Sequence, residues 1–167
     1  MTSIKNNSVI LKCMTAVFLA CLPTLAAQAK EIIGWVENVH ITSEKIKIKA
    51  KIDTGAYSAS LHCDYQAPYD RGGEKWIKFS VTDTSGRSYL LDKKIERIVK
   101  VKQHFGDVQR RYLVRMSVCL GKHDEQADVS LIDRGGLNYS MLIGRKYLKG
   151  VYIVDPSLRL TTRPRCK

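Results

Sequence analysis

The sequence predicts an all-β protein, a closed barrel of short strands with one short helix near its C-terminal end. Segments in which apolar and polar residues alternate follow one another at close intervals, and Gly and Asp residues separate them. Only one short stretch, residues 145–149, suits a helix. Many short strands with turn residues between them are typical of barrels, whose closure leaves no strand edge unpaired.

The clearest strand covers residues 45–52, where apolar side chains alternate with four lysines. A period of two places the apolar side chains on one buried face. The turn Asp83–Gly86 and the hairpin tip His104–Asp107, each with a glycine that can adopt a positive φ, separate later strands. These strands are expected over residues 76–81, 88–91, 95–102, 111–120, 126–132, 139–143 and 151–154.

The first 29 residues are expected to be a signal peptide rather than part of the fold. Lys5 and Lys12 are their only charged side chains, residues 13–22 form an apolar run, and Ala27-Gln28-Ala29 fits a cleavage site. The run is shorter than the roughly 20 apolar residues that a membrane-spanning helix needs. The sequence therefore predicts export, to the periplasm or the medium, with no transmembrane anchor after cleavage.

The rest of the chain, residues 30–167, is expected to form one domain. An uncleaved N-terminal anchor and a lipoprotein signal that uses Cys21 are the alternatives to a cleaved signal peptide. In an oxidising compartment the remaining cysteines, Cys63, Cys119 and Cys166, allow one disulfide and one free thiol. The sequence leaves their pairing open.

The chain is strongly basic, with a formal net charge of +12. Without the signal peptide, 26 basic and 16 acidic residues remain, a net charge of +10. Such a surface favours acidic partners, although export argues against nucleic acid. Because no dense basic run occurs, a generally basic soluble surface is an equal alternative. Anionic lipid, cell-wall polyanions and acidic peptides or proteins remain as candidate partners.

Chemistry is expected where the first strand ends, at Asp53-Thr54-Gly55-Ala56. Aspartic proteases need two carboxylates that share one proton, so that one acts as base on water while the other acts as acid. Thr54 would brace the loop across a dimer axis, and Gly55 would let backbone N–H groups approach the carboxylate. By itself the tripeptide is a weak signal, because Asp and Gly are common turn residues.

A second segment, Met141-Leu142-Ile143-Gly144-Arg145, resembles the second signature of retropepsins, an apolar strand that ends in Gly-Arg before a short helix. The resemblance implies a retropepsin-like (acid protease) barrel in which this strand packs beneath the Asp53 loop. It also implies that the hairpin with Phe105 and Gly106 is a flap over the substrate, which would lie beside Ala56. Gly144 and Arg145 would then support the site structurally, with Arg145 bound to a carboxylate or to backbone carbonyls.

Together with Ser58-Ala59-Ser60-Leu61-His62 and Asp133-Arg134, these motifs look like the bacterial and archaeal retropepsin-like family often labelled ATP-dependent zinc protease. The likeness covers about residues 34–156. Some relatives accompany ligases that add glutamate to a ribosomal protein. Many members carry a basic residue where this chain has Tyr57, which puts a shared substrate in doubt, and export argues against a ribosomal one.

Neither half of that label fits the residues. The four histidines lack the spacing of a zinc site, and Gly72-Gly73 lacks the Lys-Ser/Thr of a phosphate-binding loop. No metal and no cofactor is therefore expected. His62 has two interpretations, a ligand or substrate contact and, favoured here, a structural hydrogen bond near the Asp53 loop.

Asp53 is the one catalytic candidate in each chain. Asp83, in Asp83-Thr84-Ser85-Gly86, has an extra serine and a polar lead-in that favour a turn, and Asp133 lacks the following threonine. A homodimer would supply the second carboxylate. The sequence thus predicts an exported aspartic endopeptidase with Asp53, Thr54 and Gly55 at its catalytic centre. The alternative is a catalytically silent module of the same fold that binds an acidic envelope peptide or protein.

Overall fold

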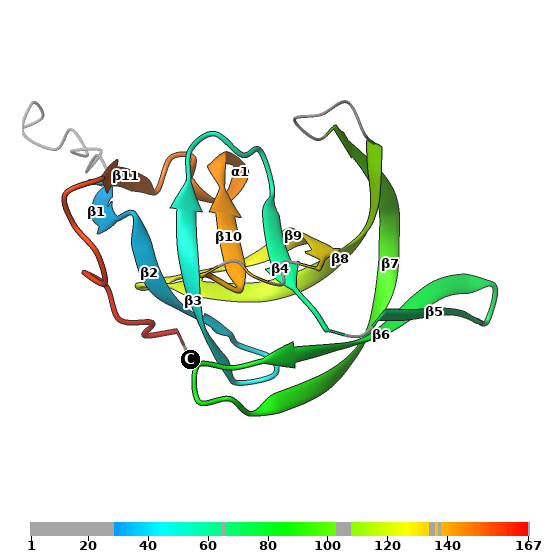
Figure 1. Cartoon of the computed structure of the whole chain (residues 1–167). Coiled ribbons are helices and arrows are strands. Elements are labelled where there is room, and N and C mark those ends of the chain that lie inside the picture. Colours follow the sequence, from blue (N-terminus) through cyan, green and yellow to red (C-terminus); the bar gives the residue numbers. More distant parts are fainter. Residues whose placement is uncertain (1–28, 65, 103–107, 134–135, 137, 167) are drawn as a thin grey trace, which may run out of the picture.

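The computed structural model describes residues 29–64, 66–102, 108–133, 136 and 138–166, and within these ranges it contains eleven strands and one helix (Figure 1). Residues 1–28 lie outside the described part, so the signal peptide stays a prediction. The elements in chain order are β1 (Glu31–Gly34), β2 (Val36–Ile41), β3 (Ile46–Asp53), β4 (Ala59–His62), β5 (Gln66–Arg71), β6 (Glu74–Thr82), β7 (Ser88–Lys102), β8 (Val108–Leu120), β9 (His123–Ile132), β10 (Met141–Gly144), α1 (Arg145–Leu148) and β11 (Tyr152–Asp155).

Six of the described strands close a barrel. They are hydrogen-bonded in the order β2-β3-β10-β4-β9-β8, and a pairing of β2 with β8 completes the ring. From β8 the sheet continues through β7, β6 and β5 as an antiparallel arm outside the barrel (Figure 1). β1 and β11 form a separate parallel pair. The predicted all-β closed barrel with one short helix is confirmed.

Apolar faces of the barrel strands and of β6 form the core. In β3 the apolar residues are buried and the lysines between them are exposed, as the alternation predicts. Removing these side chains from water is the main source of stability in such a sheet. The largest fully buried side chains among the described residues include Phe79, Ile46, Ile48, Leu61, Met116, Leu131, Met141 and Ile143. No helix in the described ranges is long and apolar enough to cross a membrane.

Some strand boundaries differ from the sequence-based expectation. Residues 88–91 and 95–102 belong to one strand, β7, because the charged run between them pairs with β6 instead of turning. β1, β2, β4 and β5 were not predicted. Four-residue β1 and β4 are too short to show a period, β5 is largely polar and contains Pro68, and buried Glu37 breaks the apolar pattern of β2.

The C-terminal segment after β11 is tied to the barrel at two points. Glu37 is fully buried and accepts hydrogen bonds from the Gly34 N–H (2.7 Å), the Thr162 N–H (3.0 Å) and the Thr161 hydroxyl (2.6 Å). Burial raises the pKa of Glu37, but these hydrogen bonds outweigh it and hold that pKa below its usual value. A disulfide joins Cys119 to Cys166, which answers the open question of pairing, and Cys63 is a buried free thiol.

Candidate active site

Parallel pairing of β3 with β10 brings Asp53 and Gly144 side by side. Ile52 lies opposite Ile143, and Asp53 lies opposite Gly144. β10 also pairs with β4, so it lies between the strands that precede and follow the loop of residues 53–58 (Figure 1). One strand therefore holds both ends of the loop that carries Asp53.

The Asp53 carboxylate is held by the backbone of its own loop. Its Oδ1 accepts hydrogen bonds from the N–H groups of Gly55 (2.9 Å) and Ala56 (3.2 Å). A Cβ on Gly55 would lie 3.1 Å from Oδ1, so glycine allows the close approach. No donor from the described residues reaches Oδ2. One oxygen is thus fixed and the other is available for chemistry.

Gly144 and the start of α1 support this loop from below. A Cβ on Gly144 would lie 2.5 Å from the Ser58 carbonyl oxygen and 2.9 Å from that of Ala56, so only glycine fits. The N–H groups of Arg145 and Lys146 donate to the carbonyls of Ala56 and Tyr57, each at 2.9 Å. N–H groups in the first turn of a helix have no partner within it, and here the loop supplies one.

The Arg145 guanidinium adds a second support. Its Nη1 donates to the carbonyl oxygens of Thr54 and Gly55, each at 2.8 Å. Arg145 therefore binds backbone carbonyls rather than a carboxylate. This contact fixes the two residues that directly follow Asp53.

A surface cavity of about 740 Å³ lies beside the loop. Thr54 and Tyr57 of the loop, Arg145 and Lys146 of α1, and Tyr152 of β11 line it. The lining is completed by Lys30, Leu148, Lys149, Gly150 and Val154, and its four cationic side chains form a cationic wall. The cavity links the Asp53 loop to the β1–β11 pair.

His62, expected near the Asp53 loop, lies elsewhere. His62 is at the far end of β4 from the Asp53 loop, where its ring contacts Asp64 at 2.8 Å and Asp133 at 3.7 Å. Phe105 and Gly106 lie outside the described residues, although β7 and β8 form the two strands of their hairpin. The described ranges contain no group of three His, Cys, Asp or Glu side chains suited to a metal ion.

Lys146 and Asp128 are site residues that no sequence motif marks. Lys146 Nζ donates to Asp128 Oδ2 at 2.7 Å, next to the Asp53 loop. A weak signal exists: in the predicted strand 126–132, alternation places Asp128 and Ser130 on one face, where a charged residue needs a partner. Which partner it has depends on the register of strands far apart in the sequence.

Comparisons with known proteins agree with this architecture. The family model described as retropepsin-like aspartic endopeptidase RimB matches residues 32–165. A probable alpha-L-glutamate ligase of Shewanella halifaxensis is 28% identical over 66% of this chain and 25% of its own length. One from Parasynechococcus marenigrum is 30% identical over 65% of this chain and 24% of its own. The chain thus spans about a quarter of the length of these curated relatives.

A solved structure is also similar. The crystal structure of Lpg0085 from Legionella pneumophila, a protein described as of unknown function, matches with a TM-score of 0.70 and 29% identity. The match covers 81% of this chain and the whole of that one.

Proposed function

Because the chain belongs to the RimB-like family of retropepsin-like aspartic endopeptidases, we propose that it is itself an aspartic endopeptidase, with Asp53 from each of two copies at the active site. The observation that carries the proposal is the Asp53 carboxylate, whose Oδ1 is fixed by Gly55 and Ala56 while the described residues place no donor on Oδ2. An oxygen left open in this way is available to water and to a second carboxylate.

Two such carboxylates sharing one proton would divide the chemistry between them. The ionised one takes a proton from water as the water oxygen bonds to the scissile carbonyl carbon, and the protonated one gives its proton to the carbonyl oxygen. Breakdown of the tetrahedral intermediate then cleaves the C–N bond, with a proton passing to the nitrogen. Like charges at close range keep the two pKa values of the pair apart.

The β1–β11 pair supports the place of a second copy. Ile32 and Ile153 lie opposite each other in this pair and are 55% and 51% exposed. Tyr152 and Val154, the neighbours of Ile153 in β11, line the cavity beside the Asp53 loop from the other face of this pair. A copy bound here through a two-fold axis would cover the apolar side chains and bring the two Asp53 loops together.

The cationic wall of the cavity supports an acidic peptide as substrate. Lys30, Arg145, Lys146 and Lys149 line it, and the whole chain is basic. We do not extend the ligase activity in the relatives' names to this protein, because it matches only about a quarter of their length. The same wall would also suit the catalytically silent binding module, so cleavage itself must be measured.

We further propose that the protein acts outside the cytoplasm. The signal-peptide pattern of residues 1–29 supports this location. The Cys119–Cys166 disulfide supports it as well, since disulfides persist in oxidising compartments.

The test is cleavage of a library of acidic and neutral peptides by the chain from Lys30 onward, from acidic to neutral pH, with and without a chelator. We expect cleavage that survives the chelator, is lost in Asp53→Asn, and follows the dimer fraction in analytical ultracentrifugation. Full activity of a folded Asp53→Asn variant would reject the aspartic mechanism. A folded protein that binds these peptides and cleaves none would favour the binding module.

A further inference from the structure

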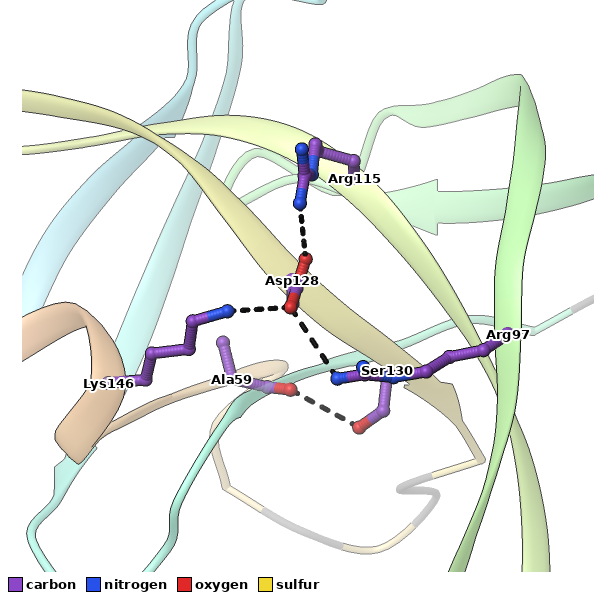
Figure 2. A network of polar contacts seen from close by, with 6 residues as sticks. All are labelled: Ala59, Arg97, Arg115, Asp128, Ser130 and Lys146. Carbon is purple, nitrogen blue, oxygen red and sulfur yellow. Dashed lines mark hydrogen bonds and ion pairs between the residues drawn. The ribbon is translucent and has the colours of Figure 1, made fainter.

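Asp128 joins three cationic side chains that come from three different elements. It lies in β9 with its side chain 9% exposed, and its oxygens lie 2.7 Å from Lys146 Nζ of α1, 3.4 Å from Arg115 Nη2 of β8 and 3.6 Å from Arg97 Nη2 of β7. Figure 2 shows the three side chains converging on this carboxylate. The hydrogen bond from Lys146 is the main cause that lowers the pKa of Asp128, and it favours the charged carboxylate.

Lys146 connects Asp128 to the loop that carries Asp53. Its backbone N–H donates to the Tyr57 carbonyl at 2.9 Å, while its Nζ donates to Asp128. Ser130, two residues along β9, donates to the Ala59 carbonyl at 3.2 Å, where β4 begins (Figure 2). One face of β9 therefore holds both α1 and the end of the Asp53 loop.

Arg97 connects Asp128 to the hairpin formed by β7 and β8. The register between these strands shifts between Ile95 and Arg97, so a bulge lies next to this residue. Bulges twist a strand and change the direction of its side chains. The Arg97 backbone pairs with Leu113 of β8, while its guanidinium reaches past β8 to Asp128 of β9. The hairpin is thus linked to the side of the barrel that carries the loop.

The charges make the carboxylate the common anchor of this cluster. Three cations surround one anion, so the cations would repel one another without it. Each cationic side chain is substantially exposed, at 59% for Arg97, 57% for Arg115 and 45% for Lys146, and a single exposed pair contributes little. Asp128 is mostly buried and shared by all three, so its removal affects every contact at once.

We infer that Asp128 is a positioning residue, which fixes the β7–β8 hairpin relative to the Asp53 loop through Arg97 and Lys146. The consequence for substrate rests on the proposed function: a peptide bound between hairpin and loop would be held at the right height above Asp53. The mechanical link between the two elements does not depend on that function. Asp128 itself touches no reacting group.

Hydrogen exchange of the protein tests the link without any substrate. For Arg97→Met, a change in the hairpin, the amide exchange rates of the loop, residues 53–58, are measured. For Asp128→Asn, the exchange rates of both the loop and residues 95–101 of β7 are measured. We expect exchange to accelerate about fivefold in the loop for both variants. Arg115→Met is the matched control, because it removes a cation from the same carboxylate, but its strand β8 stays joined to β9 by backbone pairing, which β7 lacks. It should leave loop exchange within about twofold of wild type.

Peptide cleavage then separates positioning from general stability. Asp128→Asn and Arg97→Met should each lower kcat/KM about tenfold, mainly through KM, and the double variant should lose no more than either one. Equal effects of Arg97→Met and Arg115→Met on loop exchange, or additive losses in the double variant, would overturn the inference. If wild type cleaves no peptide, the proposed function has failed, and the exchange comparison alone decides whether Asp128 links hairpin and loop.

Discussion

The chain contains two turns that begin Asp-Thr, one after β3 and one after β6, and they use the carboxylate in different ways. Asp53 has only Oδ1 engaged, by two backbone N–H groups. Asp83 has both oxygens engaged: Oδ1 by the Ser85 N–H (2.8 Å), the Ser85 hydroxyl (2.6 Å) and the Arg87 N–H (3.0 Å), and Oδ2 by the Tyr89 hydroxyl (3.2 Å). The Asp83 carboxylate thus accepts the hydrogen bonds that hold its own turn together.

The difference lies in what holds each turn in place. The Asp83 turn is held by its own aspartate, and the Ser85 hydroxyl in particular lowers the pKa of Asp83 to about 2. A carboxylate with so low a pKa is a weak base, and both of its oxygens already accept hydrogen bonds, so it is poorly suited to take a proton from water. The Asp53 loop is held from outside, by β10, Arg145 and the start of α1. A supporting frame of this kind leaves a carboxylate oxygen free to react.

Exchanging each aspartate for asparagine gives the largest expected contrast. Asp53→Asn should lower kcat/KM for peptide cleavage by about a thousandfold or more, because the group that accepts the proton of water is lost. Asp83→Asn should leave kcat/KM within about twofold, since its carboxylate only supports a turn. Steady-state kinetics on both proteins, after circular dichroism shows that each is folded, decides the point. Similar losses in the two variants would remove the functional distinction between the turns.

Much of this contrast can be predicted from the sequence, because its signals are local. The alternation in residues 45–52 places Asp53 at the end of a buried strand, and the extra serine marks Asp83 as a turn. The resemblance of residues 141–145 to the second retropepsin signature implies a strand beneath the loop. The structure does bring Asp53, Gly55, Ala56, Gly144 and Arg145 together.

Contacts that depend on register could not be predicted. Lys146 and Asp128 are 18 residues apart and meet only because β9 and α1 flank the same loop. β2 was missed since its buried Glu37 is stabilised by Thr161 and Thr162, more than a hundred residues later, in a segment with no strand pattern. His62 follows the loop closely in sequence, yet the direction of β4 carries it away from Asp53.

Adding a methyl group at Gly144, beneath the Asp53 loop, should have the next largest effect on stability and cleavage. In Gly144→Ala the new Cβ would overlap the Ser58 carbonyl, so the loop must shift. We expect a loss of about 2–3 kcal/mol in the free energy of unfolding and a fall of more than about tenfold in kcat/KM.

Gly86→Ala, in the Asp83 turn, is the control for Gly144→Ala. Gly86 has φ +83° and open space around its Cα, so alanine there should cost about 1–2 kcal/mol through backbone strain and leave kcat/KM unchanged. If both variants impaired cleavage equally, the frame beneath Asp53 would have no special role.

Two arginines, Arg145 beside the Asp53 loop and Arg87 after the Asp83 turn, allow a finer comparison. Arg145→Met removes both hydrogen bonds to the Thr54 and Gly55 carbonyls and should lower the free energy of unfolding by about 1 kcal/mol, with a smaller loss of kcat/KM than Gly144→Ala. Arg145→Lys should recover only part of the lost stability, because an ammonium lacks the planar fork of a guanidinium. Among the described residues, the Arg87 side chain makes one hydrogen bond, a long 3.5 Å contact with Tyr89, so Arg87→Met should change stability by less than about 0.5 kcal/mol. Denaturant unfolding measures all three, and equal losses for Arg145→Met and Arg87→Met would mean that the Arg145 contacts contribute nothing.

The smallest expected effect is on the pH dependence of stability, and it concerns only the Asp83 turn. The pKa of Asp83 falls from an ordinary value of 3.8 to about 2 on folding, so its ionised form stabilises the fold. This contribution to stability is complete above pH 3.8 and is lost as the pH falls through about 2.

The variant Asp83→Asn tests this contribution. It keeps an acceptor oxygen but cannot ionise, so its stability should decline less steeply between these two pH values than that of wild type. The lowered pKa values of Glu37, Asp92, Asp128 and Asp155 persist in both proteins, which leaves the difference between the two unfolding curves to Asp83. Parallel curves would show that the turn does not depend on a charged carboxylate, and the contrast with Asp53 would then rest on geometry alone.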